Sequence, residues 1–190
     1  PTIVLEDVFN NYHNFNLLSS LSIQSEGSSG FVIAVLNTEG SNQHQYYYRY
    51  TNEGVATGSG SFQTSGSYLT GQHLDLGDNS TIFFGKSRFG TGFLDAYAIF
   101  ADGSTKTMRL GQGTTGSSGY YFDNYAAATL SDGRVAVLTT FRGRATYGSS
   151  FLTIIETDGT LKHPQVKIED DFRDSPRGYS IIAVSYTHLT

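Results

Sequence analysis

Residues 71–79 read GQHLDLGDN, and residues 125–133 read YAAATLSDG. The two stretches start 54 residues apart, and each is a short strand-like run that leads into a turn. An apolar run follows both turns, at residues 81–84 and 135–138. Such internal repetition is typical of propellers and similar arrays, in which one unit cannot bury its own hydrophobic face.

Weaker copies extend the series in both directions. Residues 179–184 read YSIIAV and start a further 54 residues along the chain. A looser copy lies upstream, where residues 25–27 lead into the apolar run of residues 31–36. The repeat predicts that Leu76 and Leu130 are equivalent residues of the hydrophobic core.

A second hairpin completes each unit. The runs at residues 96–101 and 151–157 end in Asp-Gly, which tolerates the positive φ angles of a type I′ turn and predicts a hairpin between strand-like runs. Two hairpins make four strands, the content of one propeller blade. We therefore predict an all-β fold, a partial β-propeller of about three four-stranded blades with a repeat of about 54 residues. A β-sandwich or another β repeat array is the alternative.

Composition narrows the class of protein. The chain has 190 residues, of which 14% are aromatic and 15% charged, and this composition argues against a disordered chain. Its net charge of −5 and the lack of a basic stripe argue against nucleic-acid binding. No apolar run approaches the roughly 20 residues that cross a bilayer, so no membrane span is expected. The absence of cysteine excludes disulfides and zinc–thiolate sites, and it fits bacterial proteins that fold after export.

The repeat also divides the chain. We expect residues 1–22 to be an irregular lead-in or the end of a preceding element, and residues 23–184 to be a fragment of the repeat domain. After Val184 the pattern requires another turn, but residues 185–190 read SYTHLT. This tail resembles translated adapter read-through at the end of a metagenomic gene fragment, so we expect the native repeats to continue. The alternative is a natural terminal repeat with an atypical cap.

The repeat units resemble a known family. Residues 126–138 read AAATLSDGRVAVL, and residues 151–161 read FLTIIETDGTL. This pattern is similar to the propeller-like repeats of large bacterial secreted proteins of the repeats-in-toxin and adhesin type, which are calcium-dependent surface proteins. The resemblance implies an extracellular or cell-surface location. One departure is that the family carries Trp after the Val-rich strand, where this chain has Thr139 and Thr140.

Two groups of residues are candidates for ligand binding. His73 and Asp75 lie two residues apart in a strand-like run, so they point to the same face. The next copy has Ala127 and Thr129 there, which makes the pair a candidate site on a propeller axis or polar residues of a solvated strand. The second group, His44, Tyr46 and Tyr48, is a candidate aromatic surface for sugars. The alternative is a strand that packs one tyrosine inward and exposes the next.

Acidic residues raise the possibility of calcium. The turn residues Asp78, Asp102, Asp132 and Asp158 offer one carboxylate each, whereas a calcium site needs several oxygen ligands around one ion. Hairpin chemistry accounts for these residues. A denser group could supply two or three ligands or form a charged surface loop: Glu169, Asp170, Asp171 and Asp174. No other cofactor is expected.

Catalytic motifs do not appear in the sequence. No G-x-S-x-G or H-E-x-x-H occurs, and residues 111–116 match a dinucleotide fingerprint without the helix that it needs. We therefore expect a non-enzymatic recognition or spacer module of a secreted or cell-surface bacterial protein, with glycans, proteins or further blades of the same parent chain as partners. The alternatives are a fragment of a carbohydrate-active propeller enzyme, a glycosidase or lyase, and a phage tail or host-attachment component.

Overall fold

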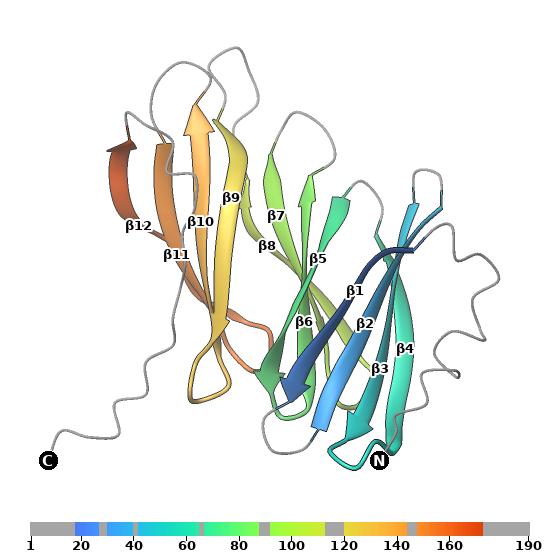
Figure 1. Cartoon of the computed structure of the whole chain (residues 1–190). Coiled ribbons are helices and arrows are strands. Elements are labelled where there is room, and N and C mark those ends of the chain that lie inside the picture. The colour runs from blue at the N-terminus through green and yellow to red at the C-terminus, as the bar shows by residue number, and fades with distance from the viewer. Residues whose placement is uncertain are drawn as a thin grey trace, which may run out of the picture.

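The computed structural model describes residues 18–26, 30–39, 42–64, 67–87, 92–112, 120–143 and 148–172. Twelve strands in this part of the chain form three four-stranded sheets (Figure 1). The first sheet contains β1 (Leu18–Glu26), β2 (Gly30–Glu39), β3 (Asn42–Thr51) and β4 (Ala56–Thr64). The second contains β5 (Ser67–Gly77), β6 (Ser80–Ser87), β7 (Phe93–Ile99) and β8 (Thr105–Gln112). The third contains β9 (Tyr120–Thr129), β10 (Val135–Gly143), β11 (Gly148–Ile155) and β12 (Leu161–Phe172).

Each sheet is an antiparallel meander of four consecutive strands. The described residues contain no helix, so the prediction of an all-β chain is confirmed, and the described part holds no helix that could cross a membrane. No sheet closes on itself. The strand β1 begins at Leu18, inside the range 1–22 that was expected to be an irregular lead-in. Residues 179–184 and 185–190 lie outside the described part of the chain.

The Asp-Gly pairs do lie in hairpin turns, but the type of turn differs from the predicted one. Gly103 donates its N–H to the carbonyl of Phe100, while Phe100 donates to the carbonyl of Ser104. These two hydrogen bonds enclose a three-residue loop in which Gly103 has a φ of 81° and Asp102 has no positive φ. The expectation of a two-residue type I′ turn is therefore wrong here. The loop is a type I turn closed by a left-handed glycine, and the Asp102 side chain accepts the N–H of Ser104 at 2.8 Å.

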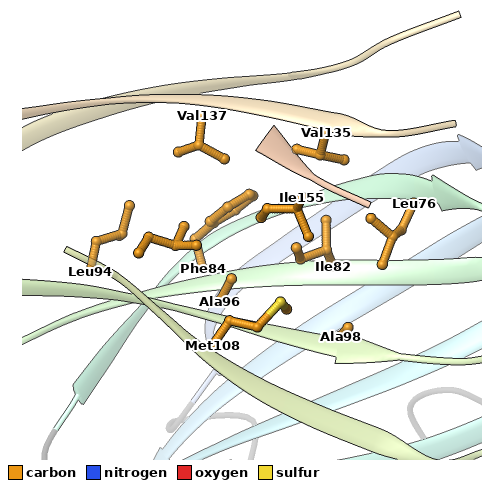
Figure 2. Packing of buried hydrophobic residues seen from close by; sticks show 11 residues of the cluster. Leu76, Ile82, Phe84, Leu94, Ala96, Ala98, Met108, Val135, Val137 and Ile155 are labelled. Carbon is orange, nitrogen blue, oxygen red and sulfur yellow. The ribbon is translucent and has the colours of Figure 1, made fainter. Parts of the chain in front are cut away.

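The sheets pack face to face. Between the second and third sheets lies the largest core cluster, in which Val135, Val137 and Ile155 face Phe84 and Leu76 (Figure 2). All five of these side chains are fully buried. Leu130, the predicted equivalent of Leu76, is only half-buried and lies outside this cluster. The prediction that Leu76 and Leu130 are equally buried core residues is therefore wrong. Leu76 packs against the neighbouring third sheet, whereas Leu130 follows a strand of the last described sheet.

A second core cluster joins the first and second sheets. Val32, Ala34 and Tyr47 from the first sheet pack with Phe83 and Ile99 from the second. Aromatic rings fill the rest of this interface, with Phe62 stacked on Tyr97 at 5.4 Å between centroids. The middle sheet is therefore covered on both faces, as in stacked repeat architectures.

The first strands of the three sheets are also neighbours. Ser22 in β1 hydrogen-bonds His73 in β5, and Thr129 in β9 donates to the carbonyl of Asp75 in β5 at 2.6 Å. Further along, Thr70 and Tyr125 share a hydrogen bond of 2.5 Å. The turns that follow β5 and β9 touch as well, since a Cβ at Gly77 would lie 3.1 Å from the Cα of Gly133. The three sheets thus meet along their first strands.

Candidate functional site

The predicted pair His73 and Asp75 faces the first sheet. Their cross-strand partners are Phe83 and Thr81, so both lie on one face of β5, as their spacing predicts. His73 is only 3% exposed, its Nδ1 lies 2.9 Å from Ser22 Oγ, and its ring stacks on Phe83. The pair therefore lies between two sheets rather than on an open strand.

Burial also sets the charge of His73. Loss of hydration lowers the pKa of this imidazole to about 4, and the nearby backbone of Val32 opposes part of that shift. His73 is therefore neutral at pH 7 and serves as an aromatic, hydrogen-bonded core residue. A ligand-binding role for it stays a prediction.

Asp75 is half-buried and shapes the end of its strand. Its Oδ1 accepts the N–H of Gly77 at 2.9 Å, and its carbonyl accepts the hydroxyl of Thr129. Gly77 has a φ of 78°, a conformation that a side chain would strain. Asp75 thus fixes the turn between β5 and β6 and the contact with β9. Its ligand-binding role likewise stays a prediction.

A buried charged network that the sequence did not reveal lies beside this pair. Arg49 Nε is 3.3 Å from Glu26 Oε1, and Thr81 donates its hydroxyl to the same oxygen at 3.0 Å. Arg49 also donates to Thr81 Oγ1 and to the carbonyl of Ile99. Glu26 and Arg49 are 7% and 9% exposed, so the network is largely buried where the first two sheets meet.

The electrostatics of this network are dominated by desolvation. Burial raises the pKa of Glu26, the Arg49 charge and the Thr81 hydrogen bond lower it, and the nearby Asp75 raises it again. A cavity of about 270 Å³ opens beside the pair. Its lining comes from both sheets: Glu26, Arg49, Tyr50, Thr57, Asn79 and Ala101. The sequence offered one signal of this buried network: Arg49 is a charged residue that alternates with tyrosines in a strand-like run.

The second predicted group forms part of an aromatic face on the first sheet. Tyr47 points toward the second sheet and is buried, whereas Tyr46 and Tyr48 lie on the opposite face and are half-buried. The strand therefore packs one ring inward and turns the next outward, which is the alternative reading of its sequence. His44 stacks on Tyr46 with 6.3 Å between ring centroids.

Apolar residues surround these rings. Phe31, Ile33, Val35 and Tyr50 pack with Tyr46 and Tyr48 on the same face. On the neighbouring strand β1, Leu21 pairs with Val35 and Ile23 pairs with Ile33. The side chains of Leu21 and Ile23 are 45% and 63% exposed. On β4, Ser59 and Ser61 are exposed beside the tyrosines. We call this face of the first sheet the aromatic face; Ile33, Val35 and Tyr50 are buried beneath it, and its other residues are Leu21, Ile23, Phe31, His44, Tyr46, Tyr48, Ser59 and Ser61.

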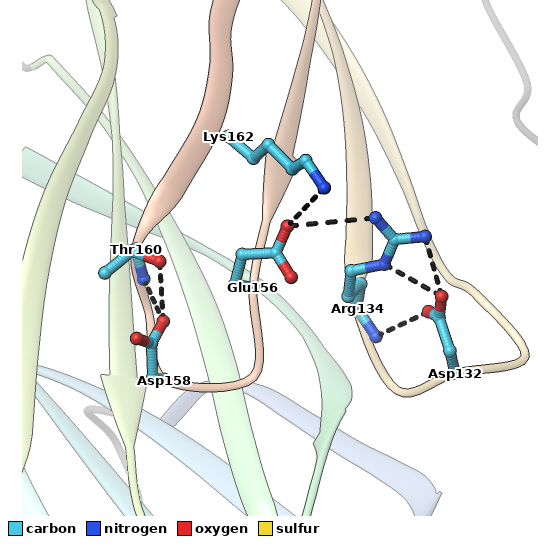
Figure 3. A network of polar contacts seen from close by, with 6 residues as sticks. All are labelled: Asp132, Arg134, Glu156, Asp158, Thr160 and Lys162. Carbon is cyan, nitrogen blue, oxygen red and sulfur yellow. Dashed lines mark hydrogen bonds and ion pairs between the residues drawn. The ribbon is translucent and has the colours of Figure 1, made fainter.

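Three of the acidic turn residues, Asp102, Asp132 and Asp158, are engaged within their own turns, and Figure 3 shows the last two. Asp158 accepts the backbone N–H and the hydroxyl of Thr160, at 2.8 and 2.7 Å. Asp132 accepts Arg134 Nε at 2.8 Å, and Arg134 also lies 3.7 Å from Glu156. These hydrogen bonds lower the pKa of both aspartates.

The predicted calcium cluster is only partly within the described chain. Glu169, Asp170 and Asp171 lie in β12, but their side chains are outside the described part, and so is Asp174 altogether. Among the side chains that are described, no three His, Cys, Asp or Glu residues come together as a metal site. Calcium binding stays a prediction for the cluster in β12.

Comparisons with known proteins identify no relative. No model of a known family matches the chain, and neither the curated proteins nor the solved structures include a match.

Proposed function

We propose that this chain is a stretch of a β-propeller-like array that serves as a non-enzymatic recognition module of a secreted or cell-surface bacterial protein. The observation that carries the proposal is the stacking of three consecutive four-stranded meanders, which meet along β1, β5 and β9. In a propeller, the first strands of successive four-stranded blades surround a common axis. The repeat period and the cysteine-free sequence, which resembles exported adhesin repeats, support the same proposal.

The polar groups inside the chain favour a structural role over catalysis. Glu26 and Arg49 neutralise each other, and Asp75 holds a turn. His73 is locked between Ser22 and Phe83. A general acid or base must reach a substrate proton, and these side chains are instead held by an ion pair and hydrogen bonds within the protein. A partner would therefore be recognised by the exposed surfaces of the chain.

The aromatic face has the chemistry of a contact surface. Tyrosine offers a large apolar ring and a hydroxyl, and it loses little side-chain entropy when it is fixed. Tyr46 and Tyr48 rest on buried Ile33 and Val35, which holds their rings in place. Leu21 and Ile23 add exposed apolar area on one side, and Ser59 and Ser61 add hydroxyls on the other. This combination suits a glycan or a protein partner.

Binding and turnover measured on the same ligands test the proposal. The whole chain is presented to arrays of bacterial and host glycans and of surface proteins, and bound glycans are checked for cleavage. We expect saturable binding without cleavage, and the double variant Tyr46→Ser/Tyr48→Ser should weaken it by about tenfold or more. Val55→Ser is the matched control, since Val55 is 60% exposed in the turn between β3 and β4. Cleavage of a bound glycan would instead favour the carbohydrate-active enzyme, and equal binding by the double variant would remove the aromatic face from recognition.

A further inference from the structure

The strand β4 is the outer edge of the first sheet. The strand order is β1-β2-β3-β4, and β3 pairs with one side of β4 from Gln43 to Tyr50. No strand in the described part of the chain pairs with its other side. An edge strand presents a row of backbone N–H and carbonyl groups, which is a template for pairing with another strand.

This edge lacks the usual protection against such pairing. Residues 56–64 read ATGSGSFQT, with no charged residue and no proline. The other outer strands do carry such residues, because β8 contains Lys106 and Arg109 and the sequence of β12 contains Pro164. Lysine and proline on an edge discourage strand addition. Six of the nine residues of β4 are exposed, so the strand is accessible along most of its length.

We propose that β4 pairs antiparallel with β4 of a second copy of this chain, across a two-fold axis at Gly60. The pairing joins two first sheets into one continuous sheet. It aligns the full length of the strand, from Ala56 opposite Thr64 to Thr64 opposite Ala56. Ser59 then lies opposite Ser61 of the partner subunit, and Gly58 lies opposite Phe62 of the partner subunit, because directly opposed residues share a face.

The shape of the strand favours this partner and this register. A Cβ placed on Gly58 would meet nothing within 4 Å, so there is room beside it for a large side chain. At Gly60 the space is already filled by the ring of Tyr47. Placing glycine on the axis and Phe62 opposite Gly58 therefore pairs a large residue with a small one, and the Phe62 ring does not obstruct the pairing because it packs against Phe83 and Tyr97 of the second sheet. Because β4 carries no charge, the pairing places no like charges opposite each other within the two strands.

The pairing goes beyond the recognition proposed above and does not depend on it. A dimer joined at β4 would carry two copies of every other surface of the chain, so a ligand with repeated epitopes would be bound by both at once. Such bivalence raises avidity without any new contact. The test below concerns the assembly alone, so it succeeds or fails independently of glycan or protein binding.

Cysteine pairing tests the register directly. The chain contains no cysteine, so an introduced thiol is the only one present. A mixture of Ser59→Cys and Ser61→Cys chains places the two thiols directly opposite, where Cα atoms are about 4.5–5.5 Å apart, a separation that suits a disulfide. Each variant alone places its thiols diagonally. We expect oxidation to give covalent dimers in the mixture and far fewer in either variant alone.

Light scattering at increasing concentration measures the association itself. We expect the native chain to approach twice its monomer mass and the Ser61→Lys chain to dissociate with a Kd raised by about tenfold or more, because the change occurs at two symmetric places. The control Ser131→Lys adds the same charge at an exposed turn residue and should leave the Kd unchanged. A native chain that stays monomeric at all concentrations overturns the proposal. Equal association of the Ser61→Lys chain, or covalent dimers at a different pair of positions, overturns it too.

Discussion

Burial of His73 should make this protein lose stability in mild acid. The imidazole is 3% exposed, and its pKa falls from 6.5 to about 4 on folding. The unfolded chain therefore binds a proton between these two pH values that the folded chain does not. Stability is fully present above pH 6.5 and is lost as the pH falls toward 4.

The size of the stability loss follows from the pKa shift of His73. At pH 5 the unfolded His73 is mostly protonated and the folded one mostly neutral, which removes about 2 kcal/mol from the free energy of unfolding. The full loss is about 3 kcal/mol below pH 4, because one pKa unit corresponds to about 1.4 kcal/mol. Such a loss is a large fraction of the stability of an ordinary domain.

Urea unfolding of the native chain and of a His73→Gln chain at several pH values isolates this effect. Glutamine cannot titrate, so the difference between the two curves contains only the contribution of His73, whatever the absolute stability of the variant. We expect that difference to change by about 2 kcal/mol between pH 7.5 and pH 5. An imidazole titration of the native chain by NMR is the independent check. Parallel stability curves, or a folded imidazole that titrates near 6.5, would refute the argument.

Three further changes probe the core, the buried charges and the turns by chemical unfolding. Leu76→Ala should cost about 2–5 kcal/mol and Leu130→Ala clearly less, because only Leu76 is fully buried, and equal losses would contradict the packing of the sheets. Arg49→Met should cost about 3–5 kcal/mol at pH 7 by leaving Glu26 without its partner. Since the pKa of Glu26 is already raised, the stability of this variant relative to the native chain should recover as acid protonates Glu26, and a deficit that is constant with pH would exclude that explanation. Gly103→Ala should cost about 1–2 kcal/mol, because the φ of 81° strains a side chain for which there is otherwise open space, and an unchanged midpoint would show that the turn can relax.

The sequence predicted the repeating unit well because that unit is local. Alternating apolar residues, Asp-Gly turns and a fixed period come from residues close together in the chain, and they are sufficient to predict four-stranded antiparallel units. The turn type was missed at Gly103 because Asp-Gly occurs in both two-residue and three-residue hairpin loops, and backbone hydrogen bonds decide between them. The face shared by His73 and Asp75 was correct because strand geometry alone fixes it.

The candidate site depended on contacts that no local pattern contains. The alternation of Tyr46, Tyr47 and Tyr48 says that neighbours lie on opposite faces, but it does not say which face a second sheet covers. Both faces of the first sheet carry apolar side chains, so the choice is made only when the sheets stack. The pairing of β1 and β3 with β2 places Glu26 near Arg49 on one face of the first sheet, and the stacking brings Thr81 of the second sheet to this pair.

The sequence by itself therefore determined the all-β class, the four-strand unit and the relative faces of neighbouring residues, since each of these follows from local backbone geometry and short-range turns. The tertiary structure alone decided that His73 is buried and neutral, that Glu26 and Arg49 form a largely buried ion pair, and that no strand in the described part of the chain covers the outer edge of β4. The physical reason is that burial and desolvation are properties of two sheets in contact. Residues about 50 positions apart create them together, and neither sheet specifies them alone.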